Sequence, residues 1–329
     1  MKILVTGGSG FIGTNYMELL SKERSAECIN IDARPPRNPG HAGFWLGCDM
    51  LDTVRLEKII KDFKPTHVVH LAAKTGLDEK HLSDFKANIE GVESLVRILK
   101  ETPSVGRAIF TSSLLVCRMG YIPESDTDYR PTTLYGQSKV RGEQIVRAAK
   151  DLPYAWTITR PISVWGPYAE QPYRDFFQSV ALNRYFHIGS GHYKRSMGYV
   201  ENMVRQIHSL LMAPVEKVNR RTFYLGDHPP VDLYEFANEV QSVLGVKKIR
   251  ALPLWSVVAA AKTGDILKTM GWKSFPLTSF RLKNIRTEYV FNLQPVIDVA
   301  GQAPYDFKAG IRRTIDYMKR VGEIKIKEK

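Results

Sequence analysis

A short apolar run that leads directly into a glycine-rich segment restricts the fold of this chain more than any other feature. Residues Lys2–Thr6 have the composition of a buried strand, residues 6–13 are rich in glycine, and a helical pattern runs from Thr14 to about Lys22. A strand that passes through a glycine-rich turn into a helix is the opening unit of a parallel βαβ sheet. The sequence therefore predicts an α/β fold.

The first half of the chain continues this alternation of strand and helix signals. Apolar runs predict further strands at residues 28–32, 67–71, 107–112 and 156–160. Apolar residues at helical spacing predict helices at residues 56–63, 84–100 and 135–150. Strands that alternate with helices of this length form parallel sheets, and continuous apolar runs are typical of strands buried on both faces. We therefore expect a doubly wound parallel sheet of the Rossmann type.

The second half of the chain is less regular. Residues 161–173 are rich in proline, glycine and aromatic side chains, and residues 174–212 mix helix and loop signals. We predict a strand at 222–225, a helix at 233–244, an irregular region with helical pieces at 250–290, and a closing helix at 309–320. Residues 1–165 are expected to form the Rossmann domain, with segments near 200–240 and 285–295 returning to it. Residues 166–329 are expected to form mainly a smaller, mixed C-terminal lobe that binds substrate.

The charge balance favours an acidic ligand. The chain of 329 residues carries 47 Lys and Arg against 34 Asp and Glu, a formal net charge of +13. Such an excess suits nucleic acid, anionic lipid or a phosphorylated small molecule. The basic residues are scattered and form no block of five like charges, so we interpret them mainly as a solvated surface that helps to attract an anionic small molecule. We expect no nucleic-acid partner.

Cysteine content and hydropathy indicate the compartment. Cys28, Cys48 and Cys117 lack metal-binding spacing, and a few unpaired cysteines fit a reducing environment. The first residues contain only a three-residue apolar run, which is too short for a signal peptide. The longest apolar stretch elsewhere, at residues 253–261, is far shorter than a membrane span. We expect a cytoplasmic protein with no metal site and no membrane partner.

The glycine-rich segment matches a phosphate-binding pattern. Gly8, Gly10 and Gly13 have the spacing G-x-G-x-x-G between a strand and a helix, where backbone N–H groups at the helix N-terminus can bind a pyrophosphate. Asp32 lies 19 residues after Gly13, at the end of the second predicted strand, and can accept hydrogen bonds from an adenosine ribose. Its charge would repel the 2′-phosphate of NADP, so we favour NAD. Arg34 and, beyond it, Arg37 keep NADP as the less favoured alternative.

A second pattern combines a phenol, an ammonium group and a hydroxyl. Tyr135 and Lys139 are spaced i, i+4 on one helix face, and Ser113 ends the preceding strand. An ordinary tyrosine has a pKa near 10, which a nearby ammonium group and an oxidised nicotinamide ring would lower. The tyrosinate could then take a proton from an alcohol while hydride leaves for the cofactor. We predict Ser113, Tyr135 and Lys139 as the catalytic residues, although such a pair by itself is usually an ordinary helix face.

With these motifs, the chain resembles the extended short-chain dehydrogenases/reductases, of the NAD-dependent nucleotide-sugar epimerase/dehydratase family. The resemblance runs nearly from end to end. The residues that carry it are segments 6–13, 48–50, 70–73, 111–113, 135–139, 160–167 and 307–314, together with Asp32, Asn88, Gly91 and Arg195.

The resemblance implies a role for each of these positions. The implied cofactor contacts, from the pyrophosphate to the nicotinamide, are Gly7, Gly10, Phe11, Ile12, Gly13, Asp32, Asp49, Met50, Leu71, Ala72, Ala73, Tyr135, Lys139 and Pro161. The implied substrate contacts are Ser113, which would hold the reacting hydroxyl, Ser163, and Arg195, which would face a substrate phosphate. Relatives often form homodimers through the helices predicted here at 84–100 and 135–150, so we also expect a homodimer.

One departure from the family pattern bears on the reaction. Many sugar-nucleotide 4,6-dehydratases and decarboxylases carry an acidic residue just after the Ser/Thr pair, where this chain has Leu114 and Leu115. Leucine neither donates nor accepts a proton, so we expect no 4,6-dehydration. The substrate contacts also differ, because Cys117 and Arg118 replace the usual Tyr-Gly and Ser163 replaces a common asparagine.

Three functions fit these observations. The first is epimerisation of a nucleotide-activated sugar by transient oxidation at C4, with NAD held tightly. The second is a dehydrogenase or ketoreductase that acts on a nucleotide sugar or on a sterol-like 3-hydroxy substrate, because residues 252–278 are similar to sterol-type 3β-hydroxy dehydrogenases. The third is a cofactor-sensing or scaffold protein without chemistry, which the intact Ser113, Tyr135 and Lys139 set disfavours. The sequence does not identify the sugar, the nucleotide or the direction of the reaction.

Overall fold

The structure is a computed structural model, and it describes residues 1–24, 26–76, 79–189, 192–269, 272 and 278–327. Its contacts divide the chain into two compact units. The first unit consists of Met1–Tyr168, Gly198–Asp227 and Phe291–Pro304. The second consists of Ala169–Met197, His228–Val290 and Tyr305–Lys329. Each unit is described here by itself.

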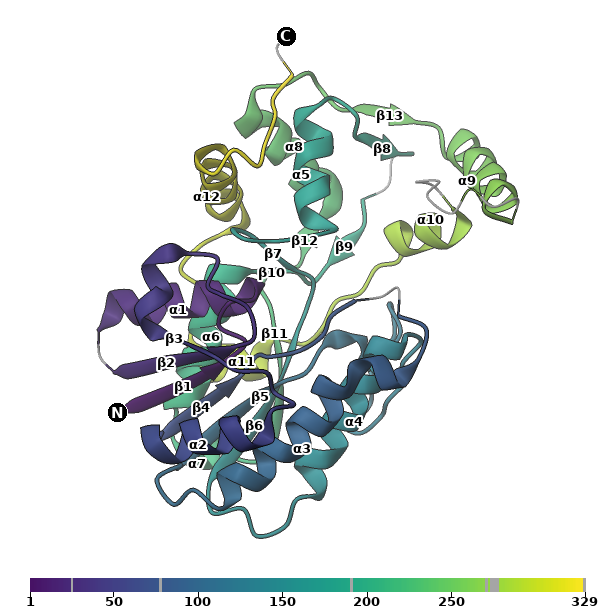
Figure 1. Cartoon of the computed structure of the whole chain (residues 1–329). Coiled ribbons are helices and arrows are strands. Elements are labelled where there is room, and N and C mark those ends of the chain that lie inside the picture. The colour runs from purple at the N-terminus through teal and green to yellow at the C-terminus, as the bar shows by residue number, and fades with distance from the viewer. Residues whose placement is uncertain (25, 77–78, 190–191, 270–271, 273–277, 328–329) are drawn as a thin grey trace. The chain divides into compact units, whose positions relative to one another are not determined.

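The first unit is built on a seven-stranded sheet in the order β11-β6-β5-β4-β1-β2-β3, with every neighbouring pair parallel (Figure 1). The strands are β1 (Lys2–Thr6), β2 (Glu27–Asp32), β3 (Trp45–Gly47), β4 (His67–His70), β5 (Arg107–Thr111), β6 (Ala155–Pro161) and β11 (Arg221–Leu225). This confirms the predicted doubly wound parallel sheet. Strand order reverses between β1 and β4, and ligands of such sheets bind at the carboxyl ends of the strands beside that reversal.

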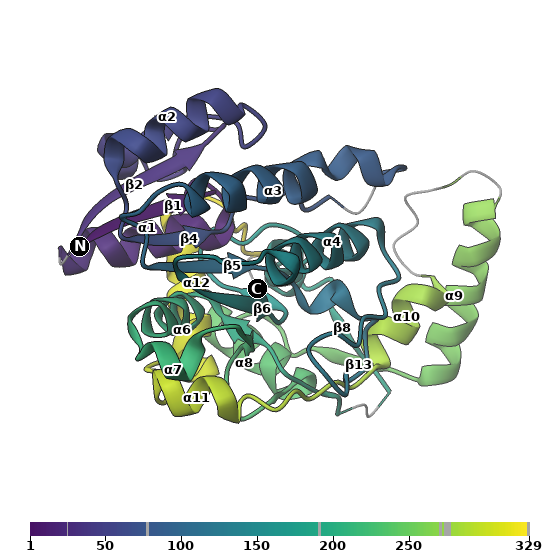
Figure 2. The same cartoon turned by 90° about the horizontal axis from the view of Figure 1, so that it is seen from below.

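Helices cover both faces of this sheet, as Figure 2 shows. One face carries α2 (Thr53–Phe63), α3 (Lys86–Lys100) and α4 (Leu134–Ala148), and the other carries α1 (Phe11–Glu23), α6 (Val200–Met212), α7 (Val215–Val218) and α11 (Gln294–Ala300). Three short 3₁₀ turns are η1 (Pro39–Phe44), η2 (Leu82–Phe85) and η3 (Leu114–Val116). A small parallel pair, β7 (Val164–Trp165) with β10 (Gly198–Tyr199), completes this unit.

The core of the first unit explains why the sequences of these strands are unbroken apolar runs. Leu4 on β1, Val68 on β4 and Ile158 on β6 are fully buried, and they belong to one apolar cluster with Leu56 of α2 and Leu95 of α3. Covering both faces of a parallel sheet with helices leaves no strand face for water. The sheet is therefore a rigid base from which the loops at its carboxyl edge project.

The second unit has more helix than sheet. Its helices are α5 (Tyr173–Ala181), α8 (Leu233–Leu244), α9 (Leu254–Thr269), α10 (Ser279–Arg286) and α12 (Phe307–Arg320). Its strands form two short pairs, β8 (Phe186–Ile188) with β13 (Arg250–Leu252), and β9 (Lys194–Arg195) with β12 (Val231–Asp232). Helix α8 packs against α5 and α12, and Phe176, Phe177 and Phe236 contact one another there.

Some elements differ from the sequence expectations. The helix predicted at 233–244 has those bounds, whereas the region 174–212 contains two separate helices, α5 and α6. Strand β3 was not predicted, because three residues at a sheet edge give too short a pattern. No helix within the described ranges is both long enough and apolar enough to cross a lipid bilayer.

Candidate active site

The glycine-rich segment forms a tight loop between β1 and α1. Gly7 has a φ of +76°, and a side chain there would collide with the backbone of Ala72 after β4. A side chain at Gly13 would collide with the carbonyl of Gly7, whereas a Cβ at Gly10 would have only that carbonyl nearby, at 3.2 Å. Gly7 and Gly13 are thus required by packing within the protein, and Gly10 leaves the backbone open to a ligand. A side chain at Gly8, the first glycine of the sequence pattern, would also collide with the side chain of Asn30.

Two other strand ends meet this loop. Asp32 ends β2, and its carboxylate accepts hydrogen bonds from the N–H groups of Ser9 (3.1 Å) and Arg34 (2.9 Å). Leu71 and Ala72 follow β4, where the N–H of Leu71 donates to the carbonyl of Thr6 over 2.9 Å. The loop, Asp32 and residues 71–73 therefore lie together at the carboxyl edge of the sheet, beside the reversal of strand order. This arrangement fits the pyrophosphate and ribose of a dinucleotide.

The two residues predicted to contact adenine have different surroundings. Asp49 is exposed, and its side chain accepts a hydrogen bond from the N–H of Leu51 (2.9 Å). Met50 is 6 % exposed and packs in the core, where Gly91 of α3 leaves room for its side chain. Of these two side chains, that of Asp49 is the one that a ligand could reach.

The structure brings Ser113, Tyr135 and Lys139 together. Ser113 follows β5 and caps η3 by accepting a hydrogen bond from the N–H of Leu115 (3.1 Å). Thr133 caps α4, which places Tyr135 in the first turn and Lys139 one turn later. The Nζ atom of Lys139 donates to the carbonyl of Thr111 (2.9 Å) and lies 6.0 Å from the centre of the Tyr135 ring.

Close packing between α4 and η3 sets this arrangement. A side chain at Gly136 would collide with the carbonyl of Leu115, so glycine next to Tyr135 lets the start of α4 lie against η3. The ring of Tyr135 also packs against the buried Phe85, with ring centres 6.2 Å apart. The phenol is thus positioned by its own helix, by η3 and by Phe85.

The protonation of this group differs in part from the sequence expectation. Burial raises the pKa of Tyr135 to about 12, and the hydrogen bond with the Ser113 side chain opposes that rise. Burial also lowers the pKa of Lys139 to about 8, and the negative charge of Glu143 opposes that change. In the ligand-free protein the cost of burying a tyrosinate is thus the largest effect on the phenol pKa, and the expected lowering by Lys139 together with an oxidised nicotinamide ring stays a prediction for the NAD-bound protein.

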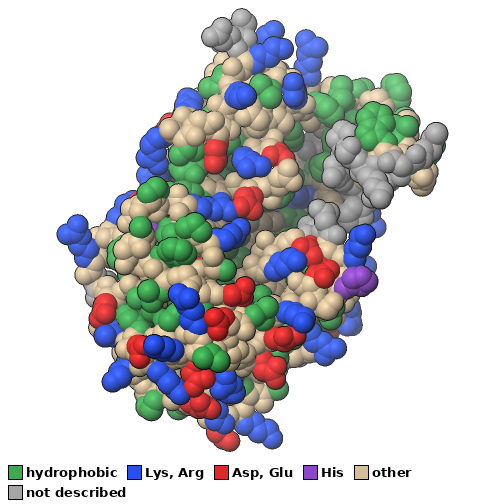
Figure 3. Space-filling view, in the orientation of Figure 1, with side chains coloured by type: hydrophobic (Ala, Val, Ile, Leu, Met, Phe, Trp, Pro, Cys, Tyr) green, Lys and Arg blue, Asp and Glu red, His purple; other side chains and the backbone are tan. Residues whose placement is uncertain are grey.

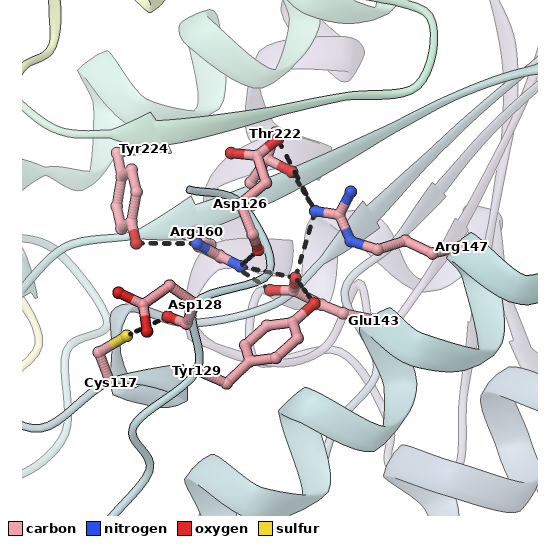
Figure 4. A network of polar contacts seen from close by, with 9 residues as sticks. All are labelled: Cys117, Asp126, Asp128, Tyr129, Glu143, Arg147, Arg160, Thr222 and Tyr224. Carbon is pink, nitrogen blue, oxygen red and sulfur yellow. Dashed lines mark hydrogen bonds and ion pairs between the residues drawn. The ribbon is translucent and has the colours of Figure 1, made fainter. Parts of the chain in front are cut away.

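Sequence reasoning missed a buried ion pair between Glu143 and Arg160 (Figure 4). Glu143, one turn after Lys139 on α4, accepts hydrogen bonds from the Nε and Nη2 atoms of Arg160, both at 2.8 Å. Arg160 is fully buried near the end of β6, and its Nη1 donates to the hydroxyl of Tyr224 (2.9 Å). Tyr129 donates to the same carboxylate over 3.0 Å. Arg160 holds the pKa of Glu143 below its usual value.

A small cavity of about 20 Å³ adjoins Lys139. It is lined in part by His70, Asn88 and Glu143, and a site of this volume holds about one water molecule. The Nδ1 atom of His70 lies 2.7 Å from the hydroxyl of Thr6, and burial lowers the pKa of His70 to about 3, so the ring is neutral. Among the groups that enclose Lys139, the charge of Glu143 opposes the lowering of its pKa by burial.

Asn88 ties the surrounding elements together. Its side chain accepts a hydrogen bond from the N–H of Lys74 (2.8 Å) and donates to the carbonyl of Lys74 and the hydroxyl of Ser138, both at 2.9 Å. This side chain fixes the loop after β4 to helices α3 and α4. In the sequence, Asn88 could be singled out because it is one of the residues that carry the resemblance to the family.

The predicted substrate residues fall in both units. Pro161 ends β6, and Ser163 follows it with a φ of +41° in the turn that leads to β7. Arg195 belongs to the second unit, where its guanidinium donates to the carbonyls of Asn284, Ile285 and Thr287 at the end of α10. These bonds give Arg195 a structural role there. Within the described residues there is no group of three His, Cys, Asp or Glu that could hold a metal ion.

Comparisons with known proteins found relatives of low identity along most of the chain. The chain is 25 % identical over 322 residues to an N-acetyl-alpha-D-glucosaminyl-diphospho-ditrans,octacis-undecaprenol 4-epimerase of Escherichia coli O157:H7, covering 96 % of this chain and 94 % of that protein. It is 28 % identical over 266 residues to a 3-beta-hydroxysteroid dehydrogenase of Mycolicibacterium neoaurum, covering 75 % and 71 % of the two chains.

A similar solved structure is that of UDP-glucuronic acid 4-epimerase from Bacillus cereus in complex with NAD. Its TM-score is 0.74 at 19 % identity, covering 98 % of this chain and 99 % of that chain, which shows a shared fold. The family model of the NAD dependent epimerase/dehydratase family matches residues 3–226, a stretch that includes the glycine loop, Ser113, Tyr135 and Lys139. The chain therefore belongs to the NAD dependent epimerase/dehydratase family and is an NAD-dependent enzyme of the epimerase and oxidoreductase type.

Proposed function

We propose that the protein is an NAD-dependent 4-epimerase of a nucleotide-activated sugar. The observation that carries the proposal is the grouping of Ser113, Tyr135 and Lys139 at the carboxyl edge of the sheet, in the same unit as the glycine loop. Low-identity relatives with 4-epimerase names support it, since one of them matches nearly the whole chain.

The cofactor would be held by the first unit. The N–H groups at the start of α1 would bind its pyrophosphate beside Gly10, and Asp32 would bind the adenosine ribose. The backbone of residues 71–73, Lys139 and Pro161 would border its nicotinamide half. When bound, NAD would accept the hydride from C4 of the sugar and return it. NAD is favoured over NADP because Asp32 would repel a 2′-phosphate, and because Arg37 already donates to the carbonyl of Tyr168 (2.9 Å).

The side chains would perform the proton transfers. Tyr135 would take the proton of the 4-hydroxyl at its phenolic oxygen and later give it back, while Ser113 would orient the sugar oxygen. Lys139, held by the carbonyl of Thr111, would keep a positive charge near the phenol. Because the phenol pKa is about 12 in the ligand-free protein, a further positive charge close to the ring is needed before Tyr135 can act as a base near neutral pH.

The residues after Ser113 argue against dehydration. Leu114 is 7 % exposed and Leu115 is half-buried, and both lie in η3 directly after the catalytic serine. No side chain of these two positions can transfer a proton, so removal of water from the sugar would lack an acid and a base at this place. The proposal therefore favours epimerisation over elimination.

The second unit is proposed to bind the rest of the substrate. Ser163 remains a candidate for contact with the sugar, and Arg195 for contact with a phosphate through donors that α10 does not occupy. We further expect a cytoplasmic homodimer that associates through α3 and α4. A dehydrogenase acting on a nucleotide sugar or a sterol-like alcohol is the second candidate, and the similarity to a hydroxysteroid dehydrogenase favours it.

Product analysis separates these functions. The protein would be incubated with a small amount of NAD and, in turn, UDP-glucose, UDP-N-acetylglucosamine and UDP-glucuronate, and the products analysed by NMR. The proposal expects the C4 epimer with no accumulation of NADH and no 4-keto-6-deoxy sugar. NADH formed in proportion to the substrate consumed would support the dehydrogenase, and a 4-keto-6-deoxy product would contradict the argument from Leu114 and Leu115.

A further inference from the structure

The second unit exposes an apolar surface along α9. Val257 and Ala261 of this helix form a small core with Leu282 of α10. On the opposite side Trp255 and Ile266 are 76 % and 60 % exposed. Because they are eleven residues apart, which is about three turns, these two side chains lie on one face of the helix. Figure 3 shows some apolar side chains on the surface near α9.

This surface is held in place. The carboxylate of Asp265 accepts a hydrogen bond from the N–H of Ser279 (3.1 Å), which fixes the start of α10 to α9. Arg195 donates to the last carbonyls of α10, and its guanidinium lies 5.1 Å from the centre of the Tyr289 ring. Trp255 and Ile266 are therefore exposed by the packing of α9, since the helix already buries its other side.

Basic residues are frequent in the sequence on either side of α9 and within it. Between residues 247 and 286 the sequence has nine Lys and Arg and a single acidic residue, Asp265. Lys262 lies on the same helix face as Trp255 and Ile266, seven residues after the first. In the part of the chain that the structure describes, six exposed basic side chains of this region form no ion pair: Lys247, Lys248, Arg250, Lys262, Lys283 and Arg286.

The combination of exposed apolar groups and unpaired cations selects one class of partner. A nucleic acid would bind the cations, but the side chain of Ile266 would remain exposed to water. An anionic bilayer uses both, because tryptophan prefers the membrane interface and basic side chains are attracted to anionic headgroups. We propose that α9 and α10 dock on the surface of an anionic lipid bilayer, with Trp255 and Ile266 inserted among the headgroups and the surrounding lysines and arginines bound to lipid phosphates.

This proposal goes beyond the catalytic one and is independent of it. It differs from the sequence-based expectation that the protein has no membrane partner. None of its residues belongs to the glycine loop or to the Ser113, Tyr135 and Lys139 group. Binding to a bilayer can therefore be tested without an identified substrate, and its failure would leave the epimerase proposal unaffected.

The test is sedimentation of the full-length protein with lipid vesicles. Vesicles of phosphatidylcholine with about 30 % phosphatidylglycerol should bind it, pure phosphatidylcholine should bind it weakly, and raising NaCl from about 0.1 to about 0.5 M should release it. The double variant Trp255→Ser/Ile266→Ser should partition at least about tenfold less. Lys262→Gln and Lys283→Gln should each reduce partitioning about fivefold.

Matched substitutions in the first unit are the controls. Val54 on α2 is 83 % exposed, and Lys58 on the same helix is also exposed. Val54→Ser and Lys58→Gln should leave partitioning unchanged, and every variant should keep its circular dichroism spectrum and its affinity for NAD. Tryptophan fluorescence quenched by brominated lipid in the wild type, but not in Trp255→Phe, would identify the inserted residue.

Two results would overturn the proposal. One is that the wild type does not bind to the anionic vesicles, or that the Trp255→Ser/Ile266→Ser variant binds to them as well as the wild type does. The other is tight, salt-dependent binding to a single-stranded RNA oligonucleotide that the lysine variants weaken and the apolar double variant does not, combined with no preference for anionic vesicles. The second result would assign the basic surface to nucleic acid.

Discussion

The two units of the chain differ in how they use charge. The first unit has 26 Lys and Arg against 23 Asp and Glu, a net charge of +3, and it buries a complete ion pair between Glu143 and Arg160. The second has 21 against 11, a net charge of +10 in a smaller part of the chain. In the first unit a pair of opposite charges is buried and orders a site. In the second unit the surplus of positive charge lies on the surface, where it can attract a partner.

The difference has a physical cause. A buried charge must be paired, because an unpaired one in an apolar interior is costly. A surface charge is hydrated and screened, so a surplus is tolerated. Substitutions in the first unit should therefore change catalysis and stability strongly, and substitutions on the basic surface of the second should change binding but not folding.

The largest expected effect is on turnover. Tyr135→Phe removes one oxygen from the proposed base and should lower kcat by about 10²-fold or more, the scale of a positioned acid–base group. NAD affinity should change by less than about 1 kcal/mol, because the glycine loop and Asp32 are intact. The measurements are steady-state kinetics and NAD titration.

A matched control removes the same atom elsewhere. Tyr154 is 4 % exposed, and its hydroxyl has no hydrogen-bond partner among the described residues. Tyr154→Phe should leave turnover unchanged. A Tyr135→Phe variant that kept most of its activity would move the base to another residue.

The second effect is on stability. Glu143→Gln leaves the guanidinium of Arg160 buried without its counter-charge and should lower the free energy of unfolding by about 3 kcal/mol. The pKa of Glu143 is lowered in the folded protein, so its stabilising effect is present above the unfolded pKa and is lost as the pH falls through the folded pKa. The variant should therefore lose less stability than the wild type on acidification.

Urea unfolding at neutral and acidic pH measures this difference. Glu57→Gln is the control, because Glu57 pairs with Lys61 on an exposed helix surface and its removal should hardly move the unfolding midpoint. If the two substitutions lowered the free energy of unfolding equally at neutral pH, the buried pair of Glu143 would stabilise the protein no more than the exposed pair of Glu57 does.

A smaller effect is expected for cofactor choice. The carboxylate of Asp32 should make NAD bind at least about tenfold more tightly than NADP, which corresponds to about 1.4 kcal/mol. Asp32→Ala should narrow that ratio, as measured by titration of both cofactors. Equal or tighter NADP binding by the wild type would show that Arg34 and Arg37 dominate instead.

The smallest expected effect is the release of a fraction of a proton when NAD binds. The phenol of Tyr135 has a pKa of about 12 without a ligand, and a positive nicotinamide ring nearby should lower it. At a pH between the phenol pKa without NAD and the lower phenol pKa with NAD, binding of NAD should therefore release a fraction of a proton from each wild-type molecule. The Tyr135→Phe variant should release less. Calorimetry in two buffers of different ionisation enthalpy measures the release, and equal release by both proteins would place the titrating group elsewhere.

The sequence predicted the first unit better than the second. Strands β1, β4, β5 and β6 could be recognised because strands buried on both faces are unbroken apolar runs. Helix α9 carries apolar and polar side chains on the same faces, so it lacks the periodicity that marks a helix with one buried face, and residues 250–290 were expected to be irregular with helical pieces.

The site shows the same limit. Tyr135 and Lys139 are visible because both lie on one helix at i, i+4, whereas Glu143 and Arg160 are 17 residues apart on different elements and meet only in the fold. The raised pKa of Tyr135 in the ligand-free protein could not be predicted, because it is caused by burial of the phenol, which the sequence does not show.

The most direct test of the proposed function follows the hydrogen at C4. A UDP-hexose that carries deuterium at C4, and that the product analysis has shown to react, would be converted by the protein with bound NAD. If NAD takes the hydride from C4 while Tyr135 takes the hydroxyl proton, and the hydride then returns to the same carbon, the epimer should keep the deuterium at C4, with no deuterated NADH in solution. Deuterium that appears in free NADH, or an epimer that has exchanged it for solvent hydrogen, would contradict the account.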